Sequence, residues 1–279
     1  MRRINKKETL GDHMLSKRIL SALIGIPLLL FITYLGDYYL LLAVFILSIL
    51  ALSEFRNISN KAQCKIMVLP MWVSVLILPV VYLFHYQYIA NILFFYLVFC
   101  YLYFLLYYPR YSPLGLSFTL FGALYIAWGF FHLVLLRQME AGFWLILYVF
   151  LVVWSTDSGA YFIGIVTGKH KWAPTISPKK SWEGVVGGLL VSFLAVWLYC
   201  RFVPGFSPAQ TKILLGITPF VSFIGQCGDL LESTLKRHAD LKDSGQLIPG
   251  HGGILDRFDS MLLAAPFTYY LFNLLERMM

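Results

Sequence analysis

The chain has 279 residues, of which 59% are hydrophobic and only 13% are charged. A soluble domain usually carries about 25% charged residues, and no water-soluble fold of this length has enough interior to hide so much apolar surface. The net charge of +8 is spread along the chain rather than gathered in one block, which argues against nucleic-acid binding. Most of this chain must therefore be solvated by lipid.

Lipid restricts the architecture to helices or a closed barrel, because every backbone polar group must pair internally. The apolar runs are long and continuous rather than alternating, which predicts helices of about 20 residues each. We expect an all-α, polytopic transmembrane bundle of about nine spans. The expected spans are residues 19–36, 38–53, 67–84, 88–108, 115–136, 143–166, 182–203, 212–228 and 259–276. The second is short and is also compatible with a hairpin joined to the first.

Basic residues are distributed unevenly between the loops. With the N-terminus inside, Arg137, Arg201, Lys212 and Arg277 fall outside, whereas the other 18 of the 22 Lys and Arg fall inside. Cytoplasmic loops are enriched in Lys and Arg. The asymmetry predicts nine spans with a cytoplasmic N-terminus. The expected location is a bacterial-type inner membrane.

The two halves of the chain differ in character. Residues 1–150 hold the first five spans and the start of the sixth, and no charged residue lies inside those five expected spans. We interpret this half as a scaffold held by packing. Residues 151–279 carry polar chemistry, mainly in two inside loops at 167–181 and 229–258, and are the expected catalytic region.

Asp157 is the first acid within an apolar run. A carboxylate at membrane depth is expensive and indicates function by default, although a buried, paired structural acid is the alternative. The residues that share its helix face, such as Ala160 and Gly164, are mostly small, which suits close helix packing. The loop that follows contains Lys179 and Lys180, which are equally typical of positive-inside anchors.

The eighth span is expected to continue beyond the hydrocarbon with a polar stripe. Asp229, Glu232, Ser233, Lys236 and Arg237 recur at spacings of three and four residues and share one helix face. A solvated face with a Glu232–Lys236 ion pair is the simpler interpretation, and the stripe alone does not decide between it and a site.

A glycine-rich segment precedes the ninth span. Gly252 and Gly253 follow His251, and glycines let the backbone approach a ligand closely, although they also serve ordinary turns. Asp229 ends one span and Asp256 opens the next at the same side, so an antiparallel hairpin places both carboxylates at one depth. Oxygen ligands of this kind suit Mg²⁺ with substrate phosphates. Nearby Lys236, Arg237 and Arg257 would neutralise the remaining phosphate charge.

The 27 residues from Ser233 to Asp259 read STLKRHADLKDSGQLIPGHGGILDRFD. This stretch closely resembles the signature of the phosphatidate cytidylyltransferase (CDP-diacylglycerol synthase) family. Residues 177–184, SPKKSWEG, and Asp157 with the AYFIG that follows at 160–164 resemble further family motifs. The family often has Thr where this chain has Ser181. The first half resembles the family mainly in hydropathy.

The resemblance implies a metal-dependent transfer of CMP from CTP to phosphatidic acid, giving CDP-diacylglycerol and pyrophosphate. It implies Mg²⁺ at Asp229 and Asp256, a potassium ion beside it, and a homodimer in the membrane. Expected catalytic residues are Ser233, Lys236, Arg237, His251 and Arg257. Expected substrate-binding residues are Asp157, Ser177, Lys179, Lys180, Glu183, Lys242, Gly252 and Gly253. Since the lipid arrives in the leaflet and CTP from the cytosol, the site is expected at the cytoplasmic rim.

Two other hypotheses fit parts of the sequence. An ion-coupled transporter would use intramembrane Asp157 and helices broken near glycines, but its polar residues would line a path through both leaflets. An enzyme of the same fold with another lipid acceptor, such as a polyprenol, is not excluded by the physics of the residues alone.

Overall fold

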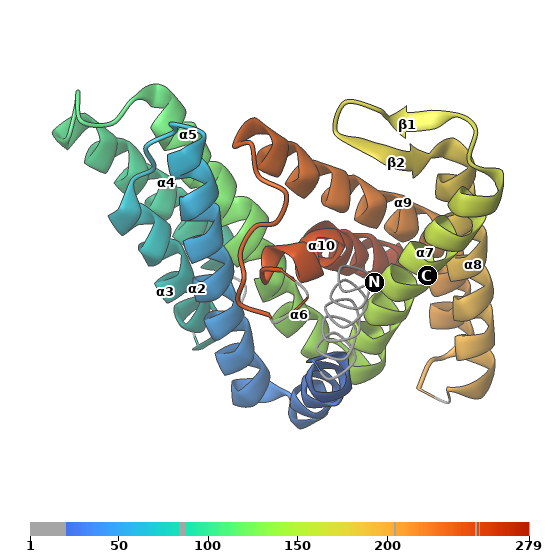
Figure 1. Ribbon diagram of the computed structural model, residues 1–279. Coiled ribbons are helices and arrows are strands. Elements are labelled where there is room, and N and C mark those ends of the chain that lie inside the picture. The colour runs from blue at the N-terminus through green and yellow to red at the C-terminus, as the bar shows by residue number, and fades with distance from the viewer. Residues whose placement is uncertain (1–20, 84–87, 204, 249, 251, 279) are drawn as a thin grey trace.

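The computed structural model describes residues 21–83, 88–203, 205–248, 250 and 252–278. An apolar helix at Ser21–Leu35 comes first. The following elements are α2 (Asp37–Lys61), α3 (Val68–Leu83), α4 (Ile89–Leu106), α5 (Pro113–Gly122), the π-helix η2 (Ala123–Trp128), α6 (Gly129–Arg137), α7 (Gly142–Thr167), β1 (Lys171–Ala173), β2 (Ser177–Ser181), α8 (Trp182–Phe202), α9 (Pro208–His238) and α10 (Leu255–Met278). Helices α2–α5 form one side of the molecule, α7–α9 and the hairpin the other, with α6 and α10 between them (Figure 1).

Six helices in the described part of the chain are long and apolar enough to cross a membrane: α2, α4, the continuous α5–η2–α6 segment, α7, α8 and α9. The helix at Ser21–Leu35 and α3 are apolar but shorter than 18 residues. Each of the nine expected spans has a helix at its position, but length and composition support six as membrane spans. Gly36 (φ 67°) separates the helix at Ser21–Leu35 from α2, so the first two expected spans form distinct helices.

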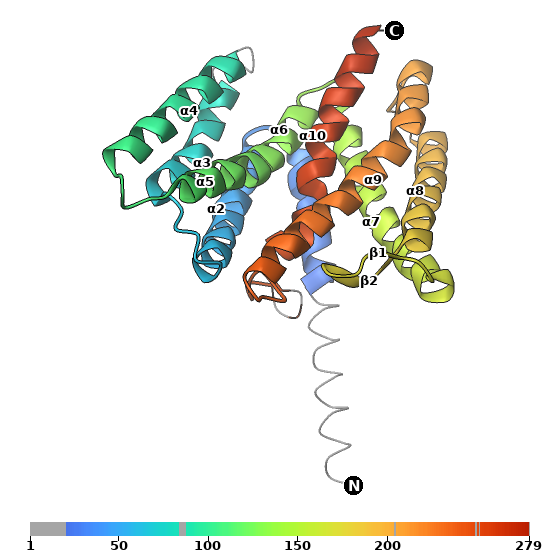
Figure 2. The same ribbon diagram turned by 90° about the horizontal axis from the view of Figure 1, so that it is seen from above.

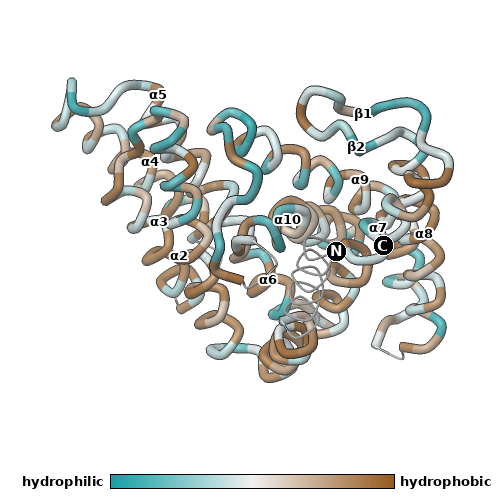
Figure 3. Tube along the Cα trace, in the orientation of Figure 1, coloured by the Kyte–Doolittle hydropathy of each residue, from teal (hydrophilic) through white to brown (hydrophobic). Residues whose placement is uncertain are grey.

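Large apolar side chains cover much of the outer surface. Leu106, Val166 and Phe202 are each at least 80% exposed, on three different helices. Such a surface marks contact with lipid or another protein. Figure 3 shows hydrophobic colour along the helices and hydrophilic colour at the hairpin and the loop before α10. The chain is thus a multi-pass helical membrane protein.

Buried polar pairs and small residues hold the second half together. Thr156 Oγ1 of α7 lies 2.7 Å from Ser222 Oγ of α9, which satisfies both hydroxyls inside the bundle. A Cβ added to Gly159 would stand 2.9 Å from the Gly187 carbonyl oxygen. The expected small face of this helix is confirmed at Gly164, where a Cβ would meet the Gly184 Cα of α8 at 3.5 Å.

The segment expected as a loop at 167–181 contains an antiparallel two-stranded hairpin, β1–β2. Trp172 on β1 packs against Trp182 and Phe223, which fixes the hairpin over α8 and α9. Ser181 ends β2 and caps α8, since its hydroxyl accepts from the Gly184 N–H at 3.2 Å. Sequence patterning missed the strands because they are short and carry few alternating apolar residues.

The C-terminal ends of α7 and α9, the N-terminal ends of α8 and α10, and the hairpin gather at one end of the bundle (Figure 2). Helix α9 runs on to His238, which confirms the expected polar extension of the eighth span. Helix α10 begins at Leu255, so Asp256 stands in its first turn rather than before it. The candidate functional residues are therefore collected at a single end.

Candidate active site

A cavity of about 660 Å³ lies beneath the hairpin, between α7, α8 and α9. Two carboxylates, Asp157 and Asp229, line it together with three ammonium groups from Lys171, Lys179 and Lys180. Such a mixture of fixed charges suits a ligand that carries phosphate groups and a bound cation.

Asp157 is exposed within this cavity rather than buried. Lys180 reaches the cavity from β2, and its Nζ lies 2.7 Å from Asp229 Oδ2. The same Nζ stands 5.8 Å from the centre of the Trp172 ring. The hairpin thus aims a lysine at the carboxylate that ends the expected eighth span.

Helices α9 and α10 cross in backbone contact beside Asp229. A Cβ on Gly228 would stand 2.6 Å from the Asp259 carbonyl oxygen, so only glycine permits this crossing. The Tyr125 hydroxyl, from η2, lies 3.4 Å from the carbonyl oxygens of both Gly228 and Asp259. π-Helical turns are frequent at functional sites, and here one brings a tyrosine to the crossing. The crossing places Asp259 within electrostatic range of Asp157, Asp229 and Glu232.

A second charged cluster lies one turn away. Lys236 Nζ is 2.5 Å from Glu232 Oε2 and 2.6 Å from Asp256 Oδ1, and these side chains are 11%, 0% and 5% exposed. The other oxygen of Asp256 accepts from Ser244 N at 2.9 Å and Gly253 N at 2.8 Å, and it lies 3.0 Å from Ser244 Oγ. Asp256 therefore organises the loop before α10 as well as pairing with Lys236.

Acidic and basic side chains crowd together at this end of the bundle. Five carboxylates stand near one another: Asp157, Asp229, Glu232, Asp256 and Asp259. The basic groups near them are Lys180, Lys236 and Arg257, and Lys171 and Lys179 also line the cavity. Glu232 Oε1 is buried without a hydrogen-bond partner in the described structure.

The described residues contain no group of three His, Cys, Asp or Glu side chains that surrounds one point in metal-binding geometry. Magnesium, however, is usually held by one or two protein carboxylates, with waters and substrate phosphates completing its octahedron. The cavity carboxylates of Asp157 and Asp229 are oxygen ligands of the kind that such a cation takes.

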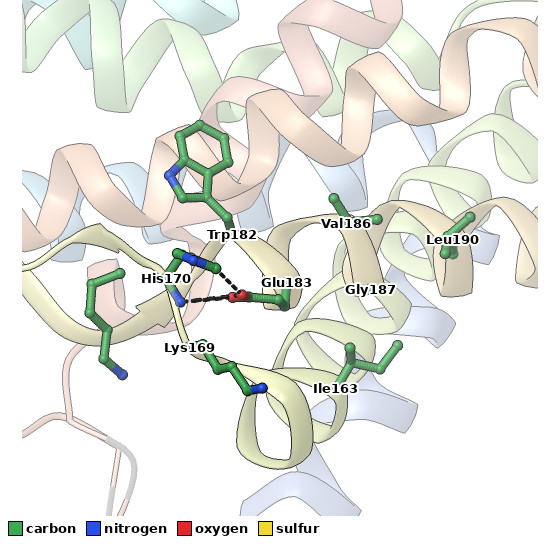
Figure 4. A pocket seen from close by; sticks show the side chains of 9 residues that line it. Ile163, Lys169, His170, Trp182, Glu183, Val186, Gly187 and Leu190 are labelled. Atoms are coloured by element: carbon green, nitrogen blue, oxygen red, sulfur yellow. Dashed lines mark hydrogen bonds and ion pairs between the residues drawn. The ribbon is translucent and has the colours of Figure 1, made fainter.

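An open groove of about 920 Å³ runs along the outer face of α7 and α8 (Figure 4). Ile163, Val186 and Leu190 form its apolar wall, and Lys169 and Lys171 stand at its polar end. Because Lys171 lines both this groove and the cavity beneath the hairpin, the two spaces meet at one side chain.

The sequence matches a family model described as the cytidylyltransferase family over residues 16–275. The chain belongs to the cytidylyltransferase family. It is 39% identical to the phosphatidate cytidylyltransferase of Staphylococcus haemolyticus over 256 residues, which cover 89% of this chain and 95% of that protein. It is 46% identical to the Bacillus subtilis phosphatidate cytidylyltransferase over 159 residues, 57% of this chain and 58% of that one. The Staphylococcus saprophyticus protein of the same name is 47% identical over 157 residues, 56% and 59% of the two chains.

Several predicted site residues of this cytidylyltransferase-family chain lie on the charged clusters. Ser233 Oγ donates to Asp229 Oδ1 at 3.3 Å. The Glu232–Lys236 ion pair, expected as the simpler interpretation of the stripe, is present. Arg257 is exposed and interacts electrostatically with Asp157.

Other predicted residues hold loops in place. Arg237 is exposed, and its guanidinium donates to the carbonyl oxygens of Ile176 and Leu241, tying α9 to the hairpin turn. Glu183 accepts from the His170 backbone N–H and lies 2.6 Å from its Nδ1, at the groove rather than the cavity. Ser177 pairs with Ala173 within the hairpin.

The glycine-rich loop approaches protein carboxylates. Gly252 has φ +86°, and a Cβ there would stand 2.5 Å from Asp256 Oδ2, whereas one on Gly253 would stand 2.2 Å from Ser244 Oγ. Lys242 is exposed in the same loop. The prediction for His251 lies outside the described residues.

Sequence reasoning missed two acids. Asp259 belongs to the quoted signature and stands three residues after Asp256, so the helical spacing was available as a signal. Glu54 follows directly after the expected second span, and nothing in its local sequence indicated that it meets the loop before α10, some 200 residues later.

Proposed function

We propose that the chain is a phosphatidate cytidylyltransferase, which transfers CMP from CTP to phosphatidic acid in phospholipid biosynthesis. The observation that carries this proposal is the cavity lined by Asp157, Asp229 and Lys180, at the end of the bundle beside an apolar groove. Its mixed charges suit a metal-bound triphosphate. The names of the similar bacterial proteins support the same conclusion.

In this reaction a phosphate oxygen of phosphatidic acid forms a bond to the α-phosphorus of CTP. The bond from that phosphorus to the oxygen bridging to the β-phosphate breaks, and pyrophosphate leaves with the electron pair. The attacking oxygen is already ionised at neutral pH, so positioning and charge stabilisation, rather than a strong base, are required of the protein.

Asp229 and Asp256, with the neighbouring acids, are the groups that would hold Mg²⁺. When bound there, the ion would polarise the α-phosphate and stabilise the departing pyrophosphate. Each aspartate is already paired with a lysine, Lys180 or Lys236. In this proposal Lys180, which lines the cavity, would offset the repulsion between two anionic substrates, and Lys236 would hold Asp256. Our proposal extends to a potassium ion beside the magnesium, as the family resemblance implies.

The groove on α7 and α8 suits the lipid substrate. An acyl chain would lie along Ile163 and Leu190, and the phosphate would meet Lys169 and Lys171 at the polar end. Lys171 also faces the cavity, so a lipid phosphate at this point is adjacent to the nucleotide. We further propose that this end faces the cytoplasm of a bacterial-type inner membrane, where the basic loops and CTP both are, and that the protein acts as a homodimer.

The test is a reconstitution of purified protein with CTP labelled in the cytosine ring, phosphatidic acid and a magnesium titration. We expect label in the lipid phase only when both phosphatidic acid and Mg²⁺ are present. If labelled lipid forms from a polyprenyl phosphate but not from phosphatidic acid, the proposed acceptor is wrong and a polyprenyl phosphate takes its place. Ion flux across proteoliposomes without any nucleotide transfer would refute the enzyme in favour of a transporter.

A further inference from the structure

Glu54 joins the two halves of the molecule at the loop that precedes α10. It lies on α2, in the half expected to be a scaffold, and is only 3% exposed. Its Oε1 accepts from the Ile254 N–H at 2.9 Å, and its Oε2 accepts from the Leu255 N–H at 3.0 Å and from Ser244 Oγ at 2.9 Å. Three donors from a distant loop therefore converge on one carboxylate.

The position of Glu54 has a clear physical basis. The N–H groups at the start of a helix have no partners within that helix, and a negative charge near them is favoured by the helix dipole. Two glycines allow the loop backbone to come this close. A Cβ on Gly245 would stand 2.7 Å from Glu54 Oε1, and one on Gly253 would stand 2.4 Å from Oε2.

The same loop carries the donors that hold Asp256. The Ser244 hydroxyl lies between the two carboxylates, 2.9 Å from Glu54 Oε2 and 3.0 Å from Asp256 Oδ2. The backbone N–H groups of Ser244 and Gly253 also donate to Asp256 Oδ2. A displacement of the loop from Glu54 would therefore move every one of these donors together.

The geometry points to Glu54 as a positioning residue: from the opposite half of the fold, it fixes the loop that orients Asp256 and, through Asp256, Lys236. This inference rests on the proposed cytidylyltransferase activity. Glu54 does not line the cavity or the groove, so its effect on turnover is transmitted through the loop and not by contact with a substrate.

The experiment compares Glu54→Gln and Ser244→Ala with wild-type protein, all purified in detergent and normalised to the folded, monodisperse fraction. Gln keeps the volume of Glu54, but its amide nitrogen cannot accept the second backbone N–H. The matched control is Glu276→Gln, because Glu276 lies on α10 at the opposite end and accepts from Gln210 Nε2 at 2.8 Å. For each we measure kcat and KM for CTP and the Mg²⁺ concentration that gives half-maximal rate.

We expect kcat/KM of Glu54→Gln to fall roughly 10- to 100-fold, as for other residues that orient ligand-binding side chains, with a higher Mg²⁺ requirement. Ser244→Ala should shift both quantities in the same direction, and Glu276→Gln should match wild type. Wild-type kinetics in a folded Glu54→Gln protein would overturn the inference. So would a variant that is less stable but has normal kinetics and normal Mg²⁺ dependence per folded molecule. If Glu54→Gln does not fold, wild-type kinetics in Ser244→Ala overturns it. An inactive wild-type protein would instead refute the proposed function.

Discussion

Lys236 stands between two carboxylates that have little access to water, so its removal tests the charge arrangement most sharply. Its Nζ is within 2.6 Å of both Glu232 and Asp256, whose side chains are 0% and 5% exposed. Lys236→Met keeps most of the side-chain volume and removes the charge. It leaves two adjacent buried acids without their shared partner.

Breaking a buried ion pair by removing one partner typically destabilises a protein by about 3–5 kcal/mol. For a chain of this size each kcal/mol corresponds to a shift of roughly 2–4 °C in Tm. The expected loss in Lys236→Met is therefore of the order of 10 °C. Because the cost arises from uncompensated acids, the double variant Glu232→Gln with Lys236→Met should recover part of that loss.

The assay is thermal unfolding in detergent, followed by the fraction of protein that remains monodisperse. Lys212→Met is the control, because Lys212 is an exposed lysine at the other end of α9. A Tm for Lys236→Met that stays within about 2 °C of wild type, well below the shift calculated for a buried pair, would refute the arrangement. So would a double variant that is less stable than the single one.

Three further variants test the loop, the groove and the hairpin. Gly253→Ala should lower kcat/KM roughly 10- to 100-fold, as expected for a misplaced site, because its Cβ would overlap the Ser244 hydroxyl and the Glu54 carboxylate. The control Gly216→Ala has open space around the added Cβ and should have wild-type kinetics. Wild-type kinetics in Gly253→Ala would contradict the loop geometry. Leu190→Trp should raise KM for phosphatidic acid roughly fivefold, a loss of about 1 kcal/mol, and leave KM for CTP unchanged. The control is Leu194→Trp, because Leu194 is also exposed on α8 but lies outside the groove, and this variant should change neither KM. Equal changes in the KM for phosphatidic acid in the two variants would exclude the groove as the lipid site. Glu183→Gln should speed tryptic cleavage of the hairpin only modestly, since exposed ion pairs contribute little to stability. Unchanged cleavage would show that this contact does not hold the hairpin.

The sequence predicted the features that depend on local periodicity and composition. The helical bundle, the continuation of the eighth span and the Glu232–Lys236 pair all follow from apolar run length and from spacings of three and four residues. Asp157 and Asp229 both line the cavity, whereas the predicted metal site shared by Asp229 and Asp256 stays a prediction.

Features set by long-range packing could not be predicted in the same way. Glu54 contacts a loop about 200 residues away, and no local pattern encodes such a contact. The hairpin depends on Trp172 meeting Phe223 across the fold. The glycines of the signature were interpreted as room for a ligand, but Gly252 and Gly253 pack against carboxylates of the protein itself. A glycine pattern indicates a close approach without identifying its partner.

The central claim is that cytidylyl transfer takes place at the charged end of α7, α9 and α10. It is tested most directly by giving the purified enzyme CTP labelled with ³²P at either the α- or the γ-phosphate, with phosphatidic acid and Mg²⁺. We predict that the α-label enters the lipid phase, that the γ-label leaves as pyrophosphate, and that Asp229→Asn abolishes both transfers while Glu276→Gln does not. Transfer of the γ-label to lipid, or undiminished α-label transfer by folded Asp229→Asn, would contradict the account.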